Sequence, residues 1–510
     1  MKTRLASASL RIGAGALAAW LAGCAAVGPD RARPAVDAPA SWRDWHGGAA
    51  SLQLPGAADR PATTGERWAA LTDPTLTRLL AIAADGNPDI AGASLRILEA
   101  RTLETTASAQ RGPQVAARAG ASRQRLSDSG SSTRLVDAIA PSGAERDQVL
   151  SFLASPYTVY QAGFDASWEL DLWGRVRRSI EAAQAQTEES DATLRGLRLT
   201  LAADVVRTYH QWRGLQAQQA LLAEQRRAAD EAEALLAAQF RGGLVTEQPL
   251  LARRQRVADL RSRDDALTLE IASAVNRLTV LCGRHPGALN DVLATPPAGP
   301  QPLPSVALGL PADLVRHRPD VAAAEARLAG TTASIGVAVA DLYPRITLGA
   351  SFGFESLHDQ ELAQWGSRQW SIGPSLSLPV FDHGRRRATV ALRELQQQEA
   401  AVAFQQTVLK AWHEVDDAAS AYASELAQQR TLDDKAALAD AAATLAQAQY
   451  GKGITDYVPV LDADQAADEV RQARADSAAR LRIRLVALYK ALGDDGTLPL
   501  APAVASASGR

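Results

Sequence analysis

Soft sulfur side chains are nearly absent from this sequence. The only cysteines are Cys24 and Cys282, and the only methionine is Met1. We predict that Cys282 is a small packed residue near the end of a helix, without a disulfide partner. The lack of methionine removes one soft ligand for copper or silver. This is weak evidence against an interior that binds these metals.

Motifs of enzymatic chemistry are also absent. The seven histidines are scattered, and there is no His-Glu-x-x-His motif, phosphate-binding glycine loop, nucleophile elbow or cysteine pair. The adjacent His413 and Glu414 are most simply a surface pair. We predict that the protein is not an enzyme, with no catalytic residue, no metal site and no cofactor other than a covalent lipid. The mild formal charge of −3 argues against a nucleic-acid partner.

The first apolar run is too short to cross a bilayer as a helix. Residues 1–23 have three basic residues and an apolar run over residues 12–22, which is typical of a signal peptide. The run ends in Leu21-Ala22-Gly23-Cys24, which resembles the lipobox of bacterial lipoproteins. This resemblance implies a diacylglycerol and an N-acyl chain on Cys24. Ala25 follows the cysteine in place of aspartate, which by the same resemblance implies the outer membrane of a Gram-negative bacterium.

Proline is missing from two stretches, residues 175–240 and 385–450, which are rich in good helix formers. As single helices, each would be roughly 100 Å long and would have to lie against other helices. In the first stretch, apolar residues step mostly by three and four, as in a coiled-coil seam. They are Leu194, Leu197, Leu201, Val205, Thr208, Trp212, Leu215 and Leu222. A cytosolic structural coiled coil would have the same pattern, but the export signal argues against it.

The two stretches belong to an internal repeat. Gly174 and Gly384, Gly243 and Gly453, and Pro249 and Pro459 are each separated by 210 residues. Pro88 and Pro319, and Pro113 and Pro344, are separated by 231. The first copy therefore has about 21 extra residues, which we assign to an exposed loop over residues 126–155. A unit of about 200 residues occurs twice.

Each copy also contains segments that alternate between apolar and small polar residues. The alternation is clearest over residues 160–168, 346–354 and 370–378, and weaker after Pro113. Such strands are long enough to cross a membrane when tilted, although an ordinary soluble hairpin has the same pattern. Four strands cannot close a barrel, and an open edge is not tolerated in lipid. Two chains would give eight strands with a filled interior, and three would give twelve with an aqueous lumen. The small polar residues suit the second.

Clusters of arginine follow the strands in both copies. They are Arg175, Arg177 and Arg178, and then Arg385, Arg386 and Arg387. Cations are unfavourable at a helix N-terminus, so acidic neighbours or lipid headgroups should hold them there. A generic surface cluster remains the alternative.

These patterns divide the chain into six segments. Residues 1–23 are the signal peptide and residues 24–67 a lipidated, extended tail. Residues 68–285 form the first repeat, with a hairpin at about 114–170, and residues 286–311 form a linker. Residues 312–493 form the second repeat, with a hairpin at about 345–380, and residues 494–510 form a C-terminal tail.

Three motifs support a family assignment: residues 24–30 (CAAVGPD), 167–175 (SWELDLWGR) and 450–463, which begin YGKGITDY and end VLDA. The sequence resembles the outer membrane factor family, and within it the TolC-like efflux lipoproteins of the OprM and NodT type. The resemblance covers about residues 24–493. It implies a fold dominated by α-helices with a transmembrane β-barrel. It also implies a homotrimer with a twelve-stranded barrel, a twelve-helix periplasmic tunnel and an equatorial girdle.

The resemblance also assigns roles to the turns between the long helices. Gly242, Gly243, Gly451 and Gly453 become periplasmic tips that contact an adaptor protein and narrow the tunnel. Glycine can end a helix in the left-handed conformation, and Thr246 or Thr455 can cap the next helix. Asp456 and Asp462 match acidic positions near the constriction. Many relatives have an arginine after this point, but here Asp464 and Gln465 follow, so a closing ion pair is left open.

The sequence thus predicts the exit duct of a tripartite efflux pump, assembled with a periplasmic adaptor and an inner-membrane pump of the RND type. The channel of a type I protein secretion system is the alternative, and the lipobox favours efflux. A lipoprotein that only scaffolds the periplasm would need a sealed or absent lumen. The sequence does not identify the exported substrate or the state of the gate.

Overall fold

The computed structural model describes residues 26–35, 37–38, 42, 48–54, 68–71, 73–128, 130, 143–295, 303–304, 306 and 317–493. The signal peptide, Cys24, most of the predicted linker and residues 494–510 lie outside this set. The chain divides into two compact units that cut across both repeats. Unit 1 comprises residues 1–32, 100–187 and 328–400, and unit 2 comprises residues 33–99, 188–327 and 401–510.

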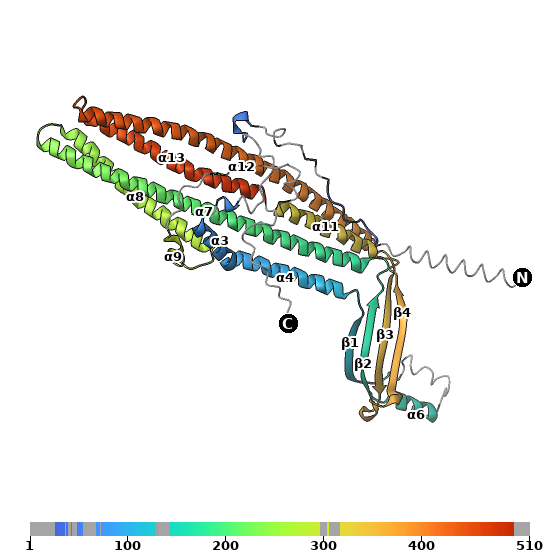
Figure 1. Ribbon diagram of the computed structural model, residues 1–510. Coiled ribbons are helices and arrows are strands. Elements are labelled where there is room, and N and C mark those ends of the chain that lie inside the picture. Colours follow the sequence, from blue (N-terminus) through green and yellow to red (C-terminus); the bar gives the residue numbers. More distant parts are fainter. Residues whose placement is uncertain are drawn as a thin grey trace. The chain divides into compact units, whose positions relative to one another are not determined.

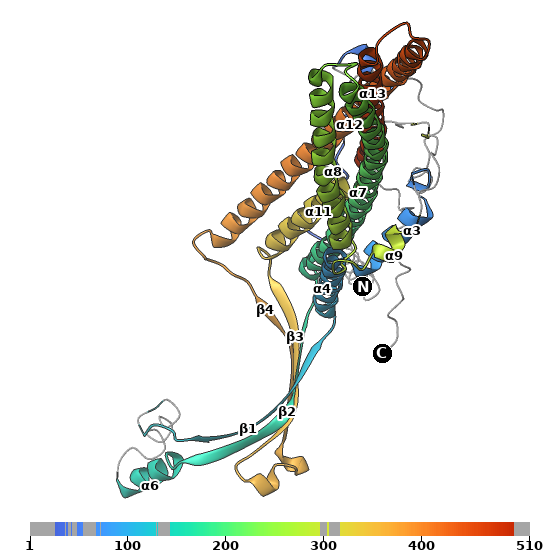
Figure 2. The same ribbon diagram turned by 90° about the vertical axis from the view of Figure 1, so that its left-hand side faces the viewer.

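Unit 1 contains a four-stranded antiparallel sheet in the order β1-β2-β3-β4 (Figure 1). The strands are β1 (Gln114–Gln124), β2 (Tyr157–Glu169), β3 (Arg345–Ser356) and β4 (Arg368–Ser377). Each copy of the repeat contributes one hairpin, and β2 pairs with β3 to join the two copies. Figure 2 shows the same sheet turned by 90°, with β1 and β2 leading to α6. The strands expected in both repeats are therefore present.

The two faces of this sheet differ as the alternation predicts. On one face, Val115, Ala166, Ala350 and Ile372 follow one another across the four strands, and Ala117, Phe164, Phe352 and Trp370 form the next row. The opposite face has small and polar residues, including hydroxyl pairs such as Ser351 with Ser371 at 2.8 Å. The large apolar side chains Phe164, Trp370 and Ile372 are exposed in the single chain. No other part of the chain that the structure describes covers them.

The connections at the far end of each hairpin have local structure. Between β1 and β2 lies the short helix α6 (Ala144–Leu153), within the excess segment of the first repeat. Between β3 and β4 lie two 3-10 turns, η3 (Asp359–Glu361) and η4 (Trp365–Ser367).

The two proline-free stretches are helical, as predicted. They form α7 (Arg175–Arg241) and α12 (Arg385–Gly451), each of 67 residues, and each contributes residues to both units. A second helix follows each: α8 (Glu247–Leu281) and α13 (Val458–Ala491). Shorter elements are η2 (Ala50–Leu52), α3 (Pro74–Gly86), α4 (Pro88–Ala109), α9 (Asn290–Leu293) and α11 (Pro319–Ala340). None of the helices in the described residues has both the length and the apolar character needed to cross a bilayer.

The core of unit 2 is formed by the predicted seam of α7. Leu194, Leu201, Val205, Thr208, Trp212, Leu215 and Leu222 are all buried. The remaining member of the predicted seam, Leu197, is partly buried against the same core. Val205, Tyr209 and Trp212 pack in one cluster with residues of α12 and α13, among them Val415 and Leu485. Cys282 follows α8 as its C-cap and is fully buried, as predicted. Burial raises the pKa of its thiol to about 11.

The repeat also appears in how each copy is closed. In the first copy, the side-chain amide of Asn87, before α4, donates to the carbonyl oxygen of Leu281 at 2.9 Å. In the second, the guanidinium of Arg318, before α11, donates to the carbonyl oxygen of Ala491 at 2.8 Å. Both contacts join the start of a shorter helix, α4 or α11, to the end of the second long helix of the same copy, α8 or α13. All four contacting residues belong to unit 2. The equivalent positions keep the spacings of 231 and 210 found in the sequence.

Arg318 also adds to one sequence-based interpretation. Its guanidinium, which is almost fully buried, contacts Glu414 at 2.6 Å and Asp320 at 2.7 Å. His413 is exposed and Glu414 is partly exposed, as expected of a surface pair, but Glu414 also binds a buried cation, which that interpretation left out. The partner of Glu414 is 96 residues away along the chain, which local sequence could not indicate.

Candidate functional site

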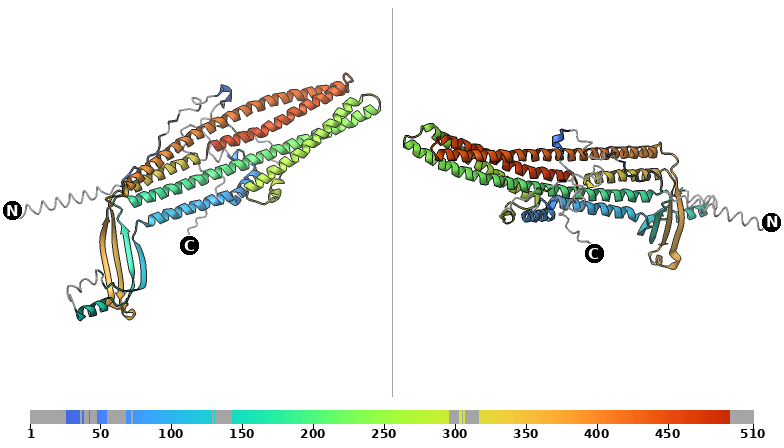
Figure 3. Two further views of the ribbon diagram at one scale, coloured as in Figure 1. Left: turned by 180° about the vertical axis from the view of Figure 1, so that it is seen from behind. Right: turned by 45° about the horizontal axis from the view of Figure 1, so that its top comes forward.

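The first candidate site comprises the two turns that join the long helices, both in unit 2. Figure 3 shows α7 with α8, and α12 with α13, each pair reversing direction at the same end of the bundle. We call these turns the helix tips, residues 242–246 and 452–457.

Both tips end their helices with the same backbone motif. Gly243 has φ 72° and Gly453 has φ 71°, in the left-handed region that glycine adopts without a steric penalty. The N–H of Leu244 donates to the carbonyl of Gln239 at 2.9 Å, and the N–H of Ile454 donates to that of Gln449 at 2.9 Å. These are Schellman bonds, which satisfy carbonyl groups that a helix end leaves unpaired. The predicted turns are present at both copies.

The other predicted tip residues contribute differently to the turns. Gly451 is the last residue of α12, and neither Gly242 nor Gly451 has a positive φ. The proposed capping role of Thr455 is wrong, because the N-cap of α13 is Tyr457. Thr246 is the N-cap of α8, but its side chain accepts no capping hydrogen bond. Each following helix instead has a proline in its first turn, Pro249 or Pro459. Because proline has no backbone N–H, one donor fewer is left there to be capped.

Each tip also presents one exposed apolar side chain that the sequence analysis did not single out. Leu244 is 77% exposed and Ile454 is 68% exposed, and both directly follow the left-handed glycine. They are 210 residues apart, which is the spacing of the repeat, so a comparison of the two copies could have identified them. Exposed apolar residues at equivalent positions provide a small surface suited to another protein.

The acidic residues predicted near a constriction are exposed, and a cation lies within electrostatic range of one of them, Asp462. Asp456 and Asp462 are both exposed to solvent. Arg253 of α8 is half-buried, and burial lowers its pKa, while the charges of Tyr457, Asp464 and Asp462 oppose that shift. An arginine on a different helix therefore lies within electrostatic range of Asp462 and Asp464. Sequence reasoning missed it because the two positions are about 210 residues apart.

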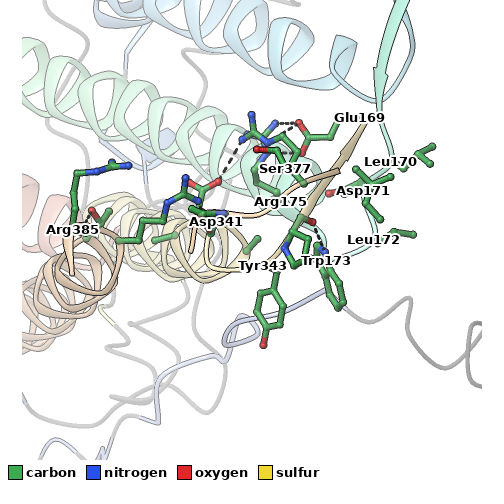
Figure 4. Close-up of a pocket in the computed structure, with 18 residues that line it drawn as sticks. Glu169, Leu170, Asp171, Leu172, Trp173, Arg175, Asp341, Tyr343, Ser377 and Arg385 are labelled. Atoms are coloured by element: carbon green, nitrogen blue, oxygen red, sulfur yellow. Dashed lines mark hydrogen bonds and ion pairs between the residues drawn. The ribbon is translucent and has the colours of Figure 1, made fainter. Parts of the chain in front are cut away.

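The second candidate site is the strand-to-helix junction in unit 1 (Figure 4). It contains a cavity of about 280 Å³ lined by the ends of β2, β3 and β4 and the starts of α7 and α12. Arg175 donates to both carboxylate oxygens of Glu169 at 2.7 and 2.8 Å, and these hydrogen bonds raise the pKa of Arg175. Trp173 stacks on Tyr343 with ring centroids 4.7 Å apart. This arrangement fixes the angle at which the chain leaves the sheet and enters α7.

Acidic neighbours hold most of the junction arginines, as one of the predicted alternatives requires. The carboxylate of Asp171 accepts from the backbone N–H groups of Val176 and Arg177, both at 2.9 Å, and thereby caps α7. Its oxygen also lies 3.4 Å from the guanidinium of Arg177. Arg386 lies 3.4 Å from Asp382. In the described part of the chain, Arg385 and Arg387 have no ion pair.

Arg178 joins two of the motifs noted in the sequence. Its side chain is 4% exposed and contacts Asp30 at 2.6 Å and Glu181 at 2.8 Å. It also donates to the carbonyl of Val27 at 3.2 Å, and the N–H of Val27 donates to the carbonyl of Trp173 at 3.0 Å. The segment after Cys24 is thereby attached to the start of α7. Cys24 itself lies outside the described residues.

Neither site has the composition of a reaction centre. Where the structure describes the chain, no group of three or more His, Cys, Asp or Glu side chains could hold a metal ion. The sites consist of exposed turns, ion pairs and a rigid junction. Such features position a chain and present surfaces to partners.

Comparisons with known proteins agree with this interpretation. A family model described as "Outer membrane efflux protein" matches residues 79–284 and 310–494. The chain is 32% identical to outer membrane protein OprJ of Pseudomonas aeruginosa over 491 residues, which cover 94% of each chain. It is also 32% identical to the toluene efflux pump outer membrane protein TtgI of Pseudomonas putida, over 82% of this chain and 85% of that protein. A solved structure of the outer-membrane channel OprN superposes with a TM-score of 0.77 at 30% identity, covering 92% of this chain and 98% of that one.

Proposed function

This chain belongs to the outer membrane efflux protein family, and from that premise we propose that it works as a homotrimer. It is the outer membrane exit duct of an efflux pump, with its helices in the periplasm. The proposal concerns the assembly, the lipid, the partners and the cargo.

The proposed trimer is supported mainly by the open sheet of unit 1. Its edge strands, β1 and β4, each have one neighbour, and its large apolar side chains are exposed. Unpaired backbone groups are not tolerated in lipid, so copies must pair edge to edge until the sheet closes. Three copies give twelve strands and an aqueous lumen, which suits the small polar residues of the opposite face. The exposed apolar face would then contact lipid.

The helix tips are the proposed contact with the periplasmic adaptor of an RND-type inner-membrane pump. Leu244 and Ile454 provide the apolar part of that contact, and the left-handed glycines keep the turns narrow. Asp456, Asp462 and Arg253 provide charged side chains in and near the tip at residues 452–457. In the proposal, interactions among such charges narrow the tunnel in its closed state. The proposal includes no catalytic step, because the duct only has to offer a continuous passage.

Small molecules are the proposed cargo. The name of the Pseudomonas putida relative refers to toluene, and this chain is similar to it over most of its length. That supports efflux over the type I secretion of a polypeptide. We test it in a strain that lacks this gene, complemented with the wild type or with an empty vector. Susceptibility to solvents, dyes, bile salts and metal salts is measured, and secreted proteins are compared in the culture supernatant.

We expect the deletion strain to be sensitive to several unrelated small compounds and to secrete its proteins normally. Normal susceptibility together with the loss of one secreted protein would move the chain to type I secretion. Complementation with the wild type must restore the original phenotype in either case.

Lipidation of Cys24 is a further part of the proposal. We expect Cys24→Ala, exported behind a signal peptide without a lipobox, to fold and form trimers but to be retained less well in the outer membrane. The reason is that residues 26–30 are held by contacts within unit 1 that do not involve the lipid, whereas acyl chains add about 0.8 kcal/mol of membrane affinity per buried methylene. Membrane fractionation and cross-linking measure the two outcomes. Loss of all trimers would contradict a purely anchoring role.

A further inference from the structure

The polar face of the four-stranded sheet has five charged side chains, and four of them are paired. Arg118 lies 2.8 Å from Asp165. Glu169 pairs with Arg175 at 2.7 Å and lies 3.7 Å from Arg345. The fifth is Glu355, near the end of β3, which has no cationic partner in the described part of the chain. The charge that remains on this face is therefore one carboxylate per chain.

Neutral donors hold this carboxylate. The side-chain amide of Gln161 on β2 donates to the Oε2 atom of Glu355 at 2.7 Å, and that of Gln369 on β4 donates to the same atom at 3.3 Å. Three strands thus converge on one charge. Because amides orient a carboxylate without cancelling its charge, the negative potential remains available to ions nearby.

The surface next to Glu355 is kept free of side chains on β2 and β3. Gly163 and Gly353 face each other one row below the carboxylate. A Cβ atom on Gly163 would lie 2.6 Å from the carbonyl oxygen of Phe352, and one on Gly353 would lie 2.7 Å from that of Ala162. Larger residues are excluded at both positions, and Glu355 is exposed.

We propose that Glu355 gives the duct a preference for cations as they pass the outer membrane. This inference rests on the proposed function, in which the polar face lines the lumen of a trimer. Threefold symmetry then places three Glu355 carboxylates at one level. A ring of carboxylates in a narrow polar passage attracts cations and repels anions. The cargo class favoured at this level is metal cations and organic ammonium compounds over anions of similar size.

The experiment is an ion-selectivity measurement on the full-length purified protein in planar bilayers. With a KCl gradient across the bilayer, the reversal potential gives the permeability ratio of K⁺ to Cl⁻. We expect Glu355→Gln to lower this ratio by about twofold relative to wild type. The matched control is Glu361→Gln, which removes the same charge in the β3–β4 connection, outside the strands. Asp456 and Asp462 are unchanged in every variant, so the difference reports on residue 355.

Chemical restoration of the charge provides a second measurement. Glu355→Cys is modified with a thiol reagent that adds either a sulfonate or an ammonium group. The sulfonate should restore the preference for K⁺ and the ammonium should reduce it further. The buried Cys282 thiol remains protected from the reagent. Conducting channels whose ion preference is identical in wild type, Glu355→Gln and both labelled forms would overturn this inference alone. Wild-type protein that forms no channels would overturn the proposed duct as well.

Discussion

Gly453→Arg should abolish efflux while leaving the trimer intact. Gly453 has a left-handed backbone, so a larger residue there costs about 1–2 kcal/mol. Apart from its chain neighbours, no atom lies within 4 Å of a Cβ at this position, so the added Cβ has open space. A guanidinium beside the exposed Ile454 would, however, put a charge into the apolar part of the proposed adaptor contact. We therefore expect the drug susceptibility of the variant to equal that of the deletion strain, with normal amounts of trimer in the outer membrane.

The control for this prediction is Gly366→Arg. Gly366 lies in the β3–β4 connection, has open space around its Cβ position and has no positive φ. Efflux should be unchanged in this variant. Normal efflux by Gly453→Arg would show that the tip at residues 452–457 contacts neither the adaptor nor the moving cargo.

Gly283→Ala should have the largest effect on folding. Gly283 has φ 61°, and a Cβ atom there would lie 1.9 Å from the carbonyl oxygen of Gly86, which is backbone and cannot rotate away. The turn after α8 would have to separate from the end of α3, in the same cluster that buries Leu278 and Cys282. We expect a loss of about 4 kcal/mol or more in the free energy of unfolding, and little protein in the outer membrane.

Gly287→Ala is the matched control for Gly283→Ala. Gly287 also has a positive φ, of 84°, but its nearest neighbour to a Cβ is the side chain of Asn290 at 3.7 Å. The free energy of unfolding of Gly287→Ala should fall by only about 1–2 kcal/mol, which is the cost of a left-handed backbone for alanine. Thermal melts of the purified proteins and their resistance to protease compare the two variants. Equal stability of both variants would mean that the contact between Gly283 and Gly86 does not hold this part of unit 2 together.

Regular features of the fold could be predicted from the sequence because they depend on local periodicity. The proline-free stretches predicted α7 and α12, and the period of two predicted which face of the sheet is apolar. The repeat spacing located both left-handed glycines at the tips. For the helices and strands, neighbouring residues contain all the information that is needed, and the glycines needed only a comparison of the two copies.

The candidate sites were less predictable because they depend on partners far along the chain. Arg178 donates to Val27 and Asp30, which are about 150 residues away along the chain. Glu355 accepts from Gln161, which is 194 residues away. The capping role expected of Thr455 was wrong because residue type alone does not determine where a turn ends and a helix begins. In this chain the turn continues to Tyr457, and Pro459 already removes one of the donors that a cap would satisfy.

The two contacts that close the repeats show how duplicated halves diverge. Asn87 makes the first contact with a neutral amide, whereas Arg318 makes the second with a guanidinium that also holds Asp320 and Glu414. Replacing Arg318 by asparagine would restore the first copy's chemistry but leave two carboxylates without their shared cation. This one substitution would therefore not give the second half a contact equivalent to that of Asn87. The two halves share a geometry but maintain it with different side-chain chemistry.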